Sequence, residues 1–486
     1  MTQSKISMAV ISQNNESVLD RLEIDNFWHN HPFSFSVTKN TPILSLVQKI
    51  SAIDPLAFLQ QLAPADTSRF YWENPSKQEA TAAWGITRDL VVESNSRFAK
   101  TQNFVDSCFK QIVREGDNSV AGSEIRIFCS FSFFPREDEI AATETATNSP
   151  AATVFLPRFQ ITKKNKNCFL LINYPLSDRS NQKQIIRQFQ EKIQNINWSQ
   201  YKTIAKQQKE ASWDKQNLFS EENSQYFKST VRSALNSIAM DEFSKIVIAH
   251  AVDIKAKKPF SVIDSLNNLR DRHPDCYIFA IGNDRGQDFI GASPERLVSI
   301  QNRQLVTDAL AGSAPRGKST SEDVQWANIL LKNRKEKREH KAVSDFIIEK
   351  LKDMGLKPYQ LPLQLLQLSN IQHLWTPIYT HLPKGIEPLD LVAQLHPTPA
   401  VAGVPHQIAC EKIRYYEKFD RALYAAPLGW IDRSDNCEFV VGIRSALIEK
   451  NRARLYAGAG IVSGSNPDKE FVEIQLKLQS LLKALV

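Results

Sequence analysis

The sequence predicts an α+β fold, in which strands and helices are mixed without regular alternation. Two segments rich in aromatic and β-branched residues, 126–136 and 152–174, are typical of strands. The segments 181–197 and 226–240 have the pattern of helices. Since these segments do not form repeated strand–helix–strand units, and no internal repeat is present, an α+β arrangement is favoured over a doubly wound sheet.

The composition indicates a globular protein that acts on a small molecule. The chain has 486 residues, of which 42% are hydrophobic and 23% charged, and its net charge of +7 is mild for this length. An anionic small substrate suits that charge better than nucleic acid does, because no basic patch with interleaved aromatic residues is present. None of the six cysteines lies within 20 residues of another, so the sequence has no closely spaced cysteine pair of the kind that binds a metal or forms a redox motif.

The sequence shows neither a membrane helix nor a secretory signal. No apolar run approaches the ~18 residues that a membrane helix needs, and the first ten residues lack the apolar stretch of a secretory signal. We therefore expect a cytoplasmic protein without membrane insertion. We also expect a monomer.

The chain divides into a scaffold, residues 1–224, and a catalytic region, residues 225–486. A polar loop is expected around 136–152 and a polar linker at 207–225, followed by the helix at 226–240 and a strand at 243–254. Thirteen of the 16 glycines fall between Gly282 and Gly464. Glycine marks backbone that turns tightly or approaches a ligand, so the chemistry is expected in the second region.

Residues Gly312 to Ser319 match the phosphate-binding pattern G-x-x-x-x-G-K-[ST]. A strand-like segment precedes them and a helical segment follows. Against a nucleotide site, no apolar strand ending in a magnesium-binding Asp follows, no strand–helix–strand series surrounds the motif, and Pro315 removes one backbone N–H. The sequence therefore disfavours a nucleotide site here and leaves it as a remote alternative.

Ionisable residues occupy unusual places in the second region. Lys245 opens an apolar strand and Glu295 stands between a Gly–Pro turn and another strand. Each has an ordinary interpretation, as a lysine reaching solvent or as a turn carboxylate. Each also suits acid–base chemistry. A helix at 322–352 and a helix at 468–486 carry carboxylates beside apolar stripes. These are either charged surfaces or the walls of a site for Mg²⁺, which prefers oxygen ligands.

Many segments, taken in order, resemble the chorismate-utilising enzymes. They are "SKIVIAHAV", "GASPERLV", "TDALAGSAPRG", "KEKREH", "LHPTPAVAGVP", "FDRALYAAPLGW", "FVVGIRSALI", "LYAGAGIVSGSNP" and "EFVEIQLK". The resemblance spans roughly 225–486 and is fainter near 126–175. It implies large antiparallel β-sheets that form a sandwich-like core surrounded by helices. Within that family, water-using members carry lysine at the position of Lys245, which implies isochorismate synthase activity.

The resemblance also implies roles for particular residues. Lys245 would take a proton from the water that attacks C2 of chorismate, and Glu295 would donate a proton to the departing C4 hydroxyl. This requires the pKa of the lysine to be lowered and the pKa of the glutamate to be raised. Glu339 and Glu473 would hold Mg²⁺, with Glu336 close by.

The remaining implied contacts concern the substrate itself. Backbone N–H groups of Gly312 and Ser313 would bind the ring carboxylate, and His396 would line the ring. The enolpyruvyl side would be bound by Tyr424, Arg444, Gly460 and Lys477. The sequence departs from the family pattern at a few other positions, namely His250, Ala422, Ala426, Gly442 and Phe471.

Three further alternatives stay open on the sequence alone. A salicylate synthase would form isochorismate and then eliminate pyruvate, and the assigned residues do not separate the two activities. Lys245 disfavours an ammonia-using synthase. A non-catalytic relative would keep the fold and be inert toward chorismate. The pathway that uses the product, for a quinone or for a siderophore, is not readable from the sequence.

Overall fold

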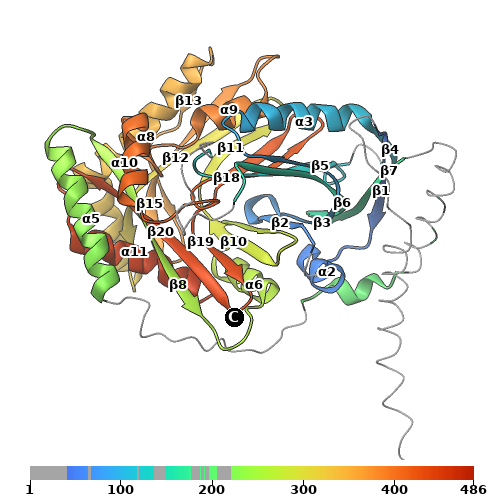
Figure 1. The fold of residues 1–486 in the computed structure, drawn as a ribbon, viewed down its shortest axis with the longest axis horizontal. Helices are drawn as coiled ribbons and strands as arrows, with labels where there is room; N and C mark the ends of the chain where they lie inside the picture. Colours follow the sequence, from blue (N-terminus) through green and yellow to red (C-terminus); the bar gives the residue numbers. More distant parts are fainter. Residues whose placement is uncertain are drawn as a thin grey trace, which may run out of the picture.

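The computed structural model describes residues 41–63, 67–117, 120–135, 149–176, 187, 191, 196–204 and 221–486. Its strands form two arms of antiparallel sheet that meet at one long strand, β6 (Ala152–Lys164). Strand β3 (Glu79–Val92) lies along one edge of β6, and β5 (Arg126–Phe131) lies along the other. The predicted α+β fold with large antiparallel sheets is confirmed (Figure 1).

The first arm continues from β3 through strands drawn from both halves of the chain. In spatial order they are β2 (Arg69–Asn74), β9 (Tyr277–Gly282), β10 (Gln287–Ser293), β19 (Ser445–Glu449), β20 (Arg452–Val462), β8 (Lys245–Lys255) and β16 (Gly403–Val404). Beyond β6, the sheet is completed by β7 (Asn167–Pro175), β1 (Ile43–Ile50) and β4 (Ile112–Gly116). Of the pairings described, only that of β1 with β4 is parallel.

The second arm continues from β5 in the same way. Its strands, in spatial order, are β17 (Pro427–Asp432), β18 (Cys437–Val441), β11 (Arg296–Gln301), β12 (Gln304–Pro315) and β15 (Ile371–His381). Two short strands extend β15, namely β13 (Tyr359–Gln360) and β14 (Gln364–Gln367). Because β2 pairs with β9 and β5 pairs with β17, the predicted scaffold and catalytic regions share their sheets.

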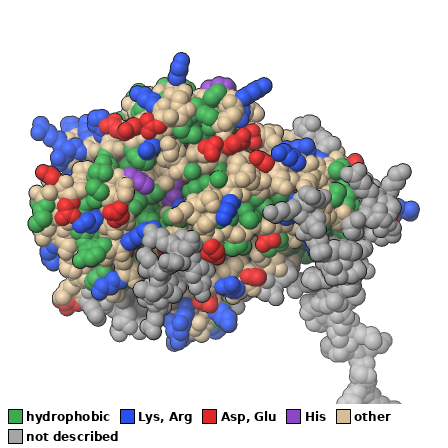
Figure 2. All heavy atoms as spheres, turned by 45° about the horizontal axis from the view of Figure 1, so that its top comes forward, with side chains coloured by type: hydrophobic (Ala, Val, Ile, Leu, Met, Phe, Trp, Pro, Cys, Tyr) green, Lys and Arg blue, Asp and Glu red, His purple; other side chains and the backbone are tan. Residues whose placement is uncertain are grey.

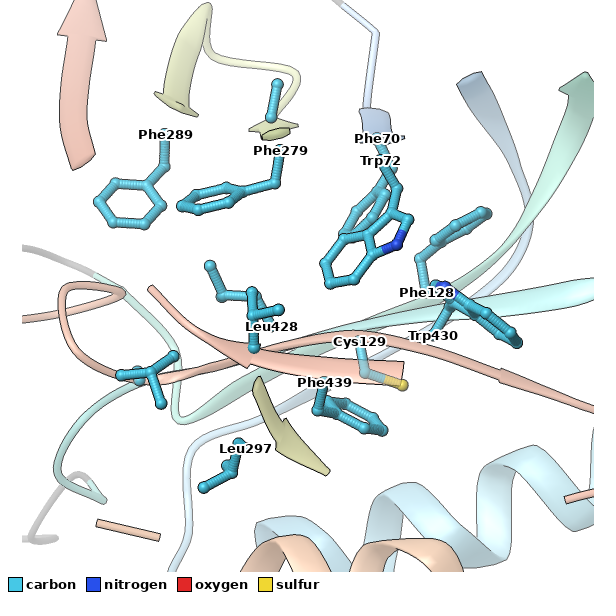
Figure 3. Packing of buried hydrophobic residues seen from close by; sticks show 14 of the residues in the cluster. Phe70, Trp72, Phe128, Cys129, Phe279, Phe289, Leu297, Leu428, Trp430 and Phe439 are labelled. Carbon is cyan, nitrogen blue, oxygen red and sulfur yellow. The ribbon is translucent and has the colours of Figure 1, made fainter. Parts of the chain in front are cut away.

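The two arms pack face to face through large aromatic side chains. Phe70 on the first arm lies 4.5 Å, centroid to centroid, from Phe128 on the second. Figure 3 shows Phe279 of β9 facing Leu428 of β17 across the same layer. All four side chains are fully buried. Alternation along the strands places large apolar residues on this inner face, and this burial is the main source of the sandwich's stability.

Helices cover the outer faces of the two arms. The helices α5 (Glu221–Ala239), α6 (Val262–Arg272) and α11 (Pro467–Leu482) lie on the first arm, and Figure 1 shows α5 and α11 beside β8 and β20. The second arm is covered by α8 (Arg334–Asp353) and α9 (Pro388–Leu395), while α3 (Arg97–Gln111) packs against α9 and against β3 and β6. Three further α-helices are α2 (Pro55–Leu62), α7 (Thr320–Lys332) and α10 (His406–Tyr416).

Two predicted elements differ in the structure. The helix predicted over 322–352 is two helices, α7 and α8, because Asn333 leaves helical geometry and its side chain accepts from the backbone N–H groups of Lys335 and Glu336. The linker predicted at 207–225 ends earlier, since α5 begins at Glu221. The rest of that linker, most of the loop at 136–152 and most of the helix at 181–197 lie outside the described residues.

Other predicted segments are observed where expected. Strand β5 occupies most of 126–136, and the segment 152–174 forms β6 and β7 around a turn with Asn165 at φ 54°. The helix at 226–240 and the strand at 243–254 are α5 and β8. No helix among the described residues is both long and apolar enough to span a bilayer. On the face drawn in Figure 2, acidic and basic side chains are interspersed, in keeping with the mild net charge.

Candidate active site

One cavity lies where the two arms meet α8 and α11, with an empty volume of about 780 Å³ that includes space open to solvent. Ten of the twelve predicted site residues line it. They are Glu295, Gly312, Ser313, Glu336, Glu339, Tyr424, Arg444, Gly460, Glu473 and Lys477. Lys245 lies directly behind this lining, whereas His396 lies elsewhere. Glu295 and Lys477, which are far apart in the chain, therefore share one site.

Glu295 lies on the connection that carries the chain from β10 of the first arm to β11 of the second. Its backbone N–H donates to Ser293 Oγ at 3.2 Å, and its carbonyl oxygen accepts from the N–H of Val441 at 3.1 Å. The side chain is buried, and burial raises the pKa of Glu295 to about 8, although the ammonium of Lys245 acts in the opposite direction. At neutral pH this carboxyl group is therefore protonated and able to donate.

Lys245 is the first residue of β8 and is 2% exposed. Its Nζ lies 3.0 Å from Glu339 Oε1, yet within the described residues it makes no contact with hydrogen-bond geometry. The interpretation of Lys245 as a lysine reaching solvent is thus excluded. Lys245 is therefore buried in an ion pair with Glu339 at the edge of the cavity, and its amine can serve as a general base only in its neutral form.

Gly460 brings the backbone of β20 against the carboxylate of Glu339. A Cβ atom at position 460 would lie 2.2 Å from Glu339 Oε1, so the carboxylate could not stay where it is. Glycine is therefore needed here for a close approach rather than for its conformation. The same strand contributes the carbonyl oxygen of Gly458, which accepts from Lys477 Nζ at 2.7 Å.

The carboxylate of Glu473 lies one helical turn from Lys477 on α11. Lys477 Nζ is 2.6 Å from Glu473 Oε1. Although burial alone would raise the pKa of Glu473, the ammonium of Lys477 lowers it below its ordinary value, with smaller contributions from other nearby cations. Glu473 is thus ionised and Lys477 is oriented along the cavity wall.

A β-bulge in β12 shapes the opposite wall. The pairing with β15 shifts register between Ala311 and Ser313, and Gly312 there has φ +80°. This turns the N–H of Ser313 into the cavity, where it donates to Glu336 Oε2 at 3.1 Å. Burial, with the neighbouring carboxylate of Glu339, raises the pKa of Glu336 to about 7. The predicted anion-binding N–H of Ser313 therefore holds a protein carboxyl group in this structure.

Arg444 lies on the second connection between the arms, from β18 to β19. It is a non-glycine residue at φ 51°, and its carbonyl oxygen accepts from Ala292 N–H at 3.0 Å. Arginine in this sparsely populated conformation, buried at a cavity, is consistent with strain retained for function. Its Nη2 lies 3.1 Å from Nε2 of His373, a residue of β15.

His396 is not among the residues that line the cavity, and its predicted contact with the substrate ring stays a prediction. It follows α9, is buried, and its Nε2 lies 3.0 Å from the carbonyl oxygen of Phe133. The ring of Phe133 packs edge-on against it at 5.5 Å. This histidine therefore joins α9 to the loop after β5.

The P-loop match has no counterpart among the described residues. Residues as far as Pro315 belong to β12 and pair with β15, so no phosphate-sized loop precedes α7. The N–H groups of Gly317 and Lys318 donate instead to the side chains of Asp323 and Glu322. The chain's own carboxylates therefore occupy the donors that a phosphate would need.

The surroundings of the predicted metal ligands show which donor groups lie near them. Among the residues that the structure describes, no three His, Cys, Asp or Glu side chains are grouped closely enough to hold a metal ion. Even so, several glutamates line one cavity, and burial raises the pKa of Glu470 as well as that of Glu336. Carboxylate oxygens are the donors that a hard cation such as Mg²⁺ prefers, so these glutamates would suit such an ion by donor type.

Sequence reasoning missed several residues that line the cavity, and two of their side chains, Lys335 and His373, bear on its chemistry. Lys335 on α8 bridges to Glu470 on α11, with Nζ 2.8 Å from Oε1, and so ties together the two helices that carry the carboxylates. The other is His373, within the apolar segment "IQHLW". A histidine in an apolar strand was the available signal for it.

A buried lysine, a protonated glutamate and a buried arginine around one cavity are the features of an acid–base enzyme for a small anion. The chain belongs to the chorismate binding enzyme family, which its residues 31–486 match. It is 30% identical over 463 residues to the isochorismate synthase MenF of Bacillus subtilis, covering 91% of this chain and 93% of that protein. It is 32% identical over 457 residues to the salicylate biosynthesis isochorismate synthase of Pseudomonas aeruginosa, covering 90% and 89%.

Solved structures share the overall fold of this chain. MenF, the menaquinone-specific isochorismate synthase of Escherichia coli, superposes with a TM-score of 0.74 at 26% identity, covering 96% of this chain and 100% of that chain. Anthranilate synthase component I of Streptococcus pneumoniae shares the fold at a TM-score of 0.59 and 17% identity, covering 98% of this chain and 100% of that chain. The resemblance stated from the sequence is thus confirmed at the level of the family.

Proposed function

We propose that this protein is an isochorismate synthase, which isomerises chorismate to isochorismate. The observation that carries the proposal is the presence of two groups at one cavity, Lys245, which is buried in an ion pair with Glu339, and Glu295, whose raised pKa keeps it protonated at neutral pH. The names of the relatives that match over about nine-tenths of the chain support the same activity.

The two side chains would perform the two proton transfers of the reaction. Neutral Lys245 takes a proton from water as the water oxygen bonds to C2 of the ring, and the ring double bonds shift. Glu295 then gives its proton to the C4 hydroxyl, which leaves as water. One water is consumed and one is released, so the net change is an isomerisation, and proton return from Lys245 to Glu295 resets the site.

The cations of the cavity would bind the two carboxylates of chorismate. The planar guanidinium of Arg444 suits one of them, because it can donate two parallel hydrogen bonds. Lys477 supplies a second positive charge, and Tyr424, whose ring stacks on Tyr456 at 5.1 Å, closes that side.

The carboxylates of the same cavity would hold the metal ion. Glu339 and Glu473, with Glu336 nearby, are the residues that would bind Mg²⁺. When bound, the ion supplies positive charge for the ring carboxylate of the substrate.

The decisive experiment is incubation of the purified protein with chorismate and Mg²⁺, followed by product separation by HPLC. Isochorismate alone is the expected product, and Lys245→Ala is expected to abolish its formation. Salicylate with pyruvate would replace this proposal by salicylate synthase activity, and anthranilate formed with ammonium would refute the water-using assignment. A folded protein that leaves chorismate unchanged would indicate a non-catalytic relative.

A further inference from the structure

His373 connects two walls of the cavity that come from different sheet arms. The β12–β15 register places it opposite Ser313, directly after the bulge at Gly312. Its Nδ1 lies 3.0 Å from Ser313 Oγ, and its Nε2 lies 3.1 Å from Arg444 Nη2. Both ring nitrogens are therefore engaged, one by each wall.

The chemistry of arginine decides where the proton of the imidazole resides. A guanidinium has five N–H donors and no acceptor, so Nε2 of His373 must accept from Arg444. The remaining proton is then on Nδ1, which donates to the hydroxyl oxygen of Ser313. A doubly protonated ring would bring an N–H of His373 against an N–H of Arg444, and the contact at 3.1 Å would be lost.

We propose that His373 is a positioning residue that, as the neutral Nδ1–H tautomer, orients the guanidinium of Arg444 for a substrate carboxylate. Resting on the proposed function, this assigns a role in binding chorismate rather than in transferring its protons. The ring is buried, and burial together with the charge of Arg444 places the pKa of His373 well below 6.5, in keeping with a neutral ring.

The contact matters because it orients a side chain whose backbone is already fixed. The connection between β18 and β19 holds Arg444 at φ 51°, and the hydrogen bond from Nη2 to His373 then sets the direction of the guanidinium. A long side chain that is ordered before the substrate arrives loses less entropy on binding. The same histidine steadies Ser313, whose N–H contacts Glu336.

Two substitutions separate the two nitrogens of His373. In His373→Gln, the amide oxygen can reach the place of Nε2 and accept from Arg444, whereas in His373→Asn the amide nitrogen takes the place of Nδ1 and only the donor to Ser313 is kept. We expect KM for chorismate to rise about tenfold or more in His373→Asn, since a hydrogen bond to a charged group is lost. We expect a clearly smaller rise in His373→Gln, with kcat changed by less than about threefold in both, because neither proton transfer involves this residue.

The matched control is His250→Gln, a buried histidine that packs against the rings of Phe227 and Phe471 and does not line the cavity, for which KM should not change. Equal effects of His373→Gln and His373→Asn on KM, or a fall in kcat with KM unchanged, would overturn the proposal. Thermal melting of every variant identifies those that fail to fold.

A second measurement does not depend on activity. In protein labelled with ¹⁵N-histidine, the His373 signals are those that disappear in His373→Gln. We expect a protonated, pyrrole-type Nδ1 and an unprotonated, pyridine-type Nε2, with no change across neutral pH. The opposite tautomer or an imidazolium would overturn the proposal. If the wild-type protein does not convert chorismate, the proposed function fails, while the tautomer still tests the contact with Arg444.

Discussion

Replacing Glu295 by glutamine should remove activity and at the same time stabilise the protein at high pH. In the folded protein, burial raises the pKa of Glu295 from 4.5 to about 8. The folded state therefore holds the proton more tightly than the unfolded state does. The stability that this group contributes to the wild-type protein is therefore complete below pH 4.5 and is lost as the pH rises to about 8.

The size of the effect follows from the same two pKa values. At pH ~7 the unfolded carboxyl group is ionised and the folded one is mostly protonated, which costs the wild type about 3 kcal/mol, and at pH ~9 the cost approaches ~5 kcal/mol. The glutamine side chain of the Glu295→Gln variant carries no charge in either state, so the variant should escape this cost. Its free energy of unfolding should therefore exceed that of wild type by an amount that grows from pH ~5 to pH ~9.

The assay is urea-induced unfolding of both proteins at several pH values, with the difference in unfolding free energy as the readout. Titrating groups that do not interact with Glu295 contribute equally to both proteins and cancel in that difference. Isochorismate formation by the variant should fall by about 10²- to 10⁴-fold, the usual contribution of a general acid. A difference in stability that does not vary with pH would show that Glu295 is ionised in the folded protein, and its role as proton donor would be refuted.

Two further predictions concern glycine and lysine positions that the sequence singled out. Gly460→Ala should reduce Mg²⁺ affinity and kcat by about 10- to 100-fold, because the new Cβ would lie 2.2 Å from Glu339 Oε1 and the flexible carboxylate must move. Titration with Mn²⁺ and the chorismate assay would test this, and unchanged affinity would contradict it. Lys318→Ala should leave activity unaffected, and ATP should not raise the melting temperature of the wild type, since the N–H groups of this segment are occupied; ATP binding lost in Lys318→Ala would contradict this.

Much of the fold and site could be predicted because the relevant signals are local. The strands β5, β6 and β8 have the required β-branched and aromatic runs, and Lys245, Glu295 and Glu473 stand within segments that resemble the family. The break between α7 and α8 was missed, since Asn333 within a polar stretch reads equally well as a helical residue. Only its side-chain contacts show it as the cap that starts α8.

The sheet order was harder to predict because it depends on pairings far apart in the chain. The cavity forms at the two connections between the arms, one at Glu295 and one at Arg444. These connections lie together because β10 pairs with β19 and β11 pairs with β18. No local pattern specifies such pairings, which are selected by the packing of the inner faces as a whole.

His373 and His396 show that residue type alone does not identify which histidine belongs to the site. His373 and His396 are both buried and both lie beside a leucine, so burial and the neighbouring leucine do not distinguish them. What differs is the partner of each ring, since His396 meets a backbone carbonyl and His373 meets a guanidinium and a hydroxyl. A carbonyl partner can be satisfied anywhere in a core. A buried arginine that donates to a histidine ring needs hydrogen-bond acceptors around it and an anion to balance its charge. The histidine beside a buried arginine is therefore the one expected at a site for an anionic substrate.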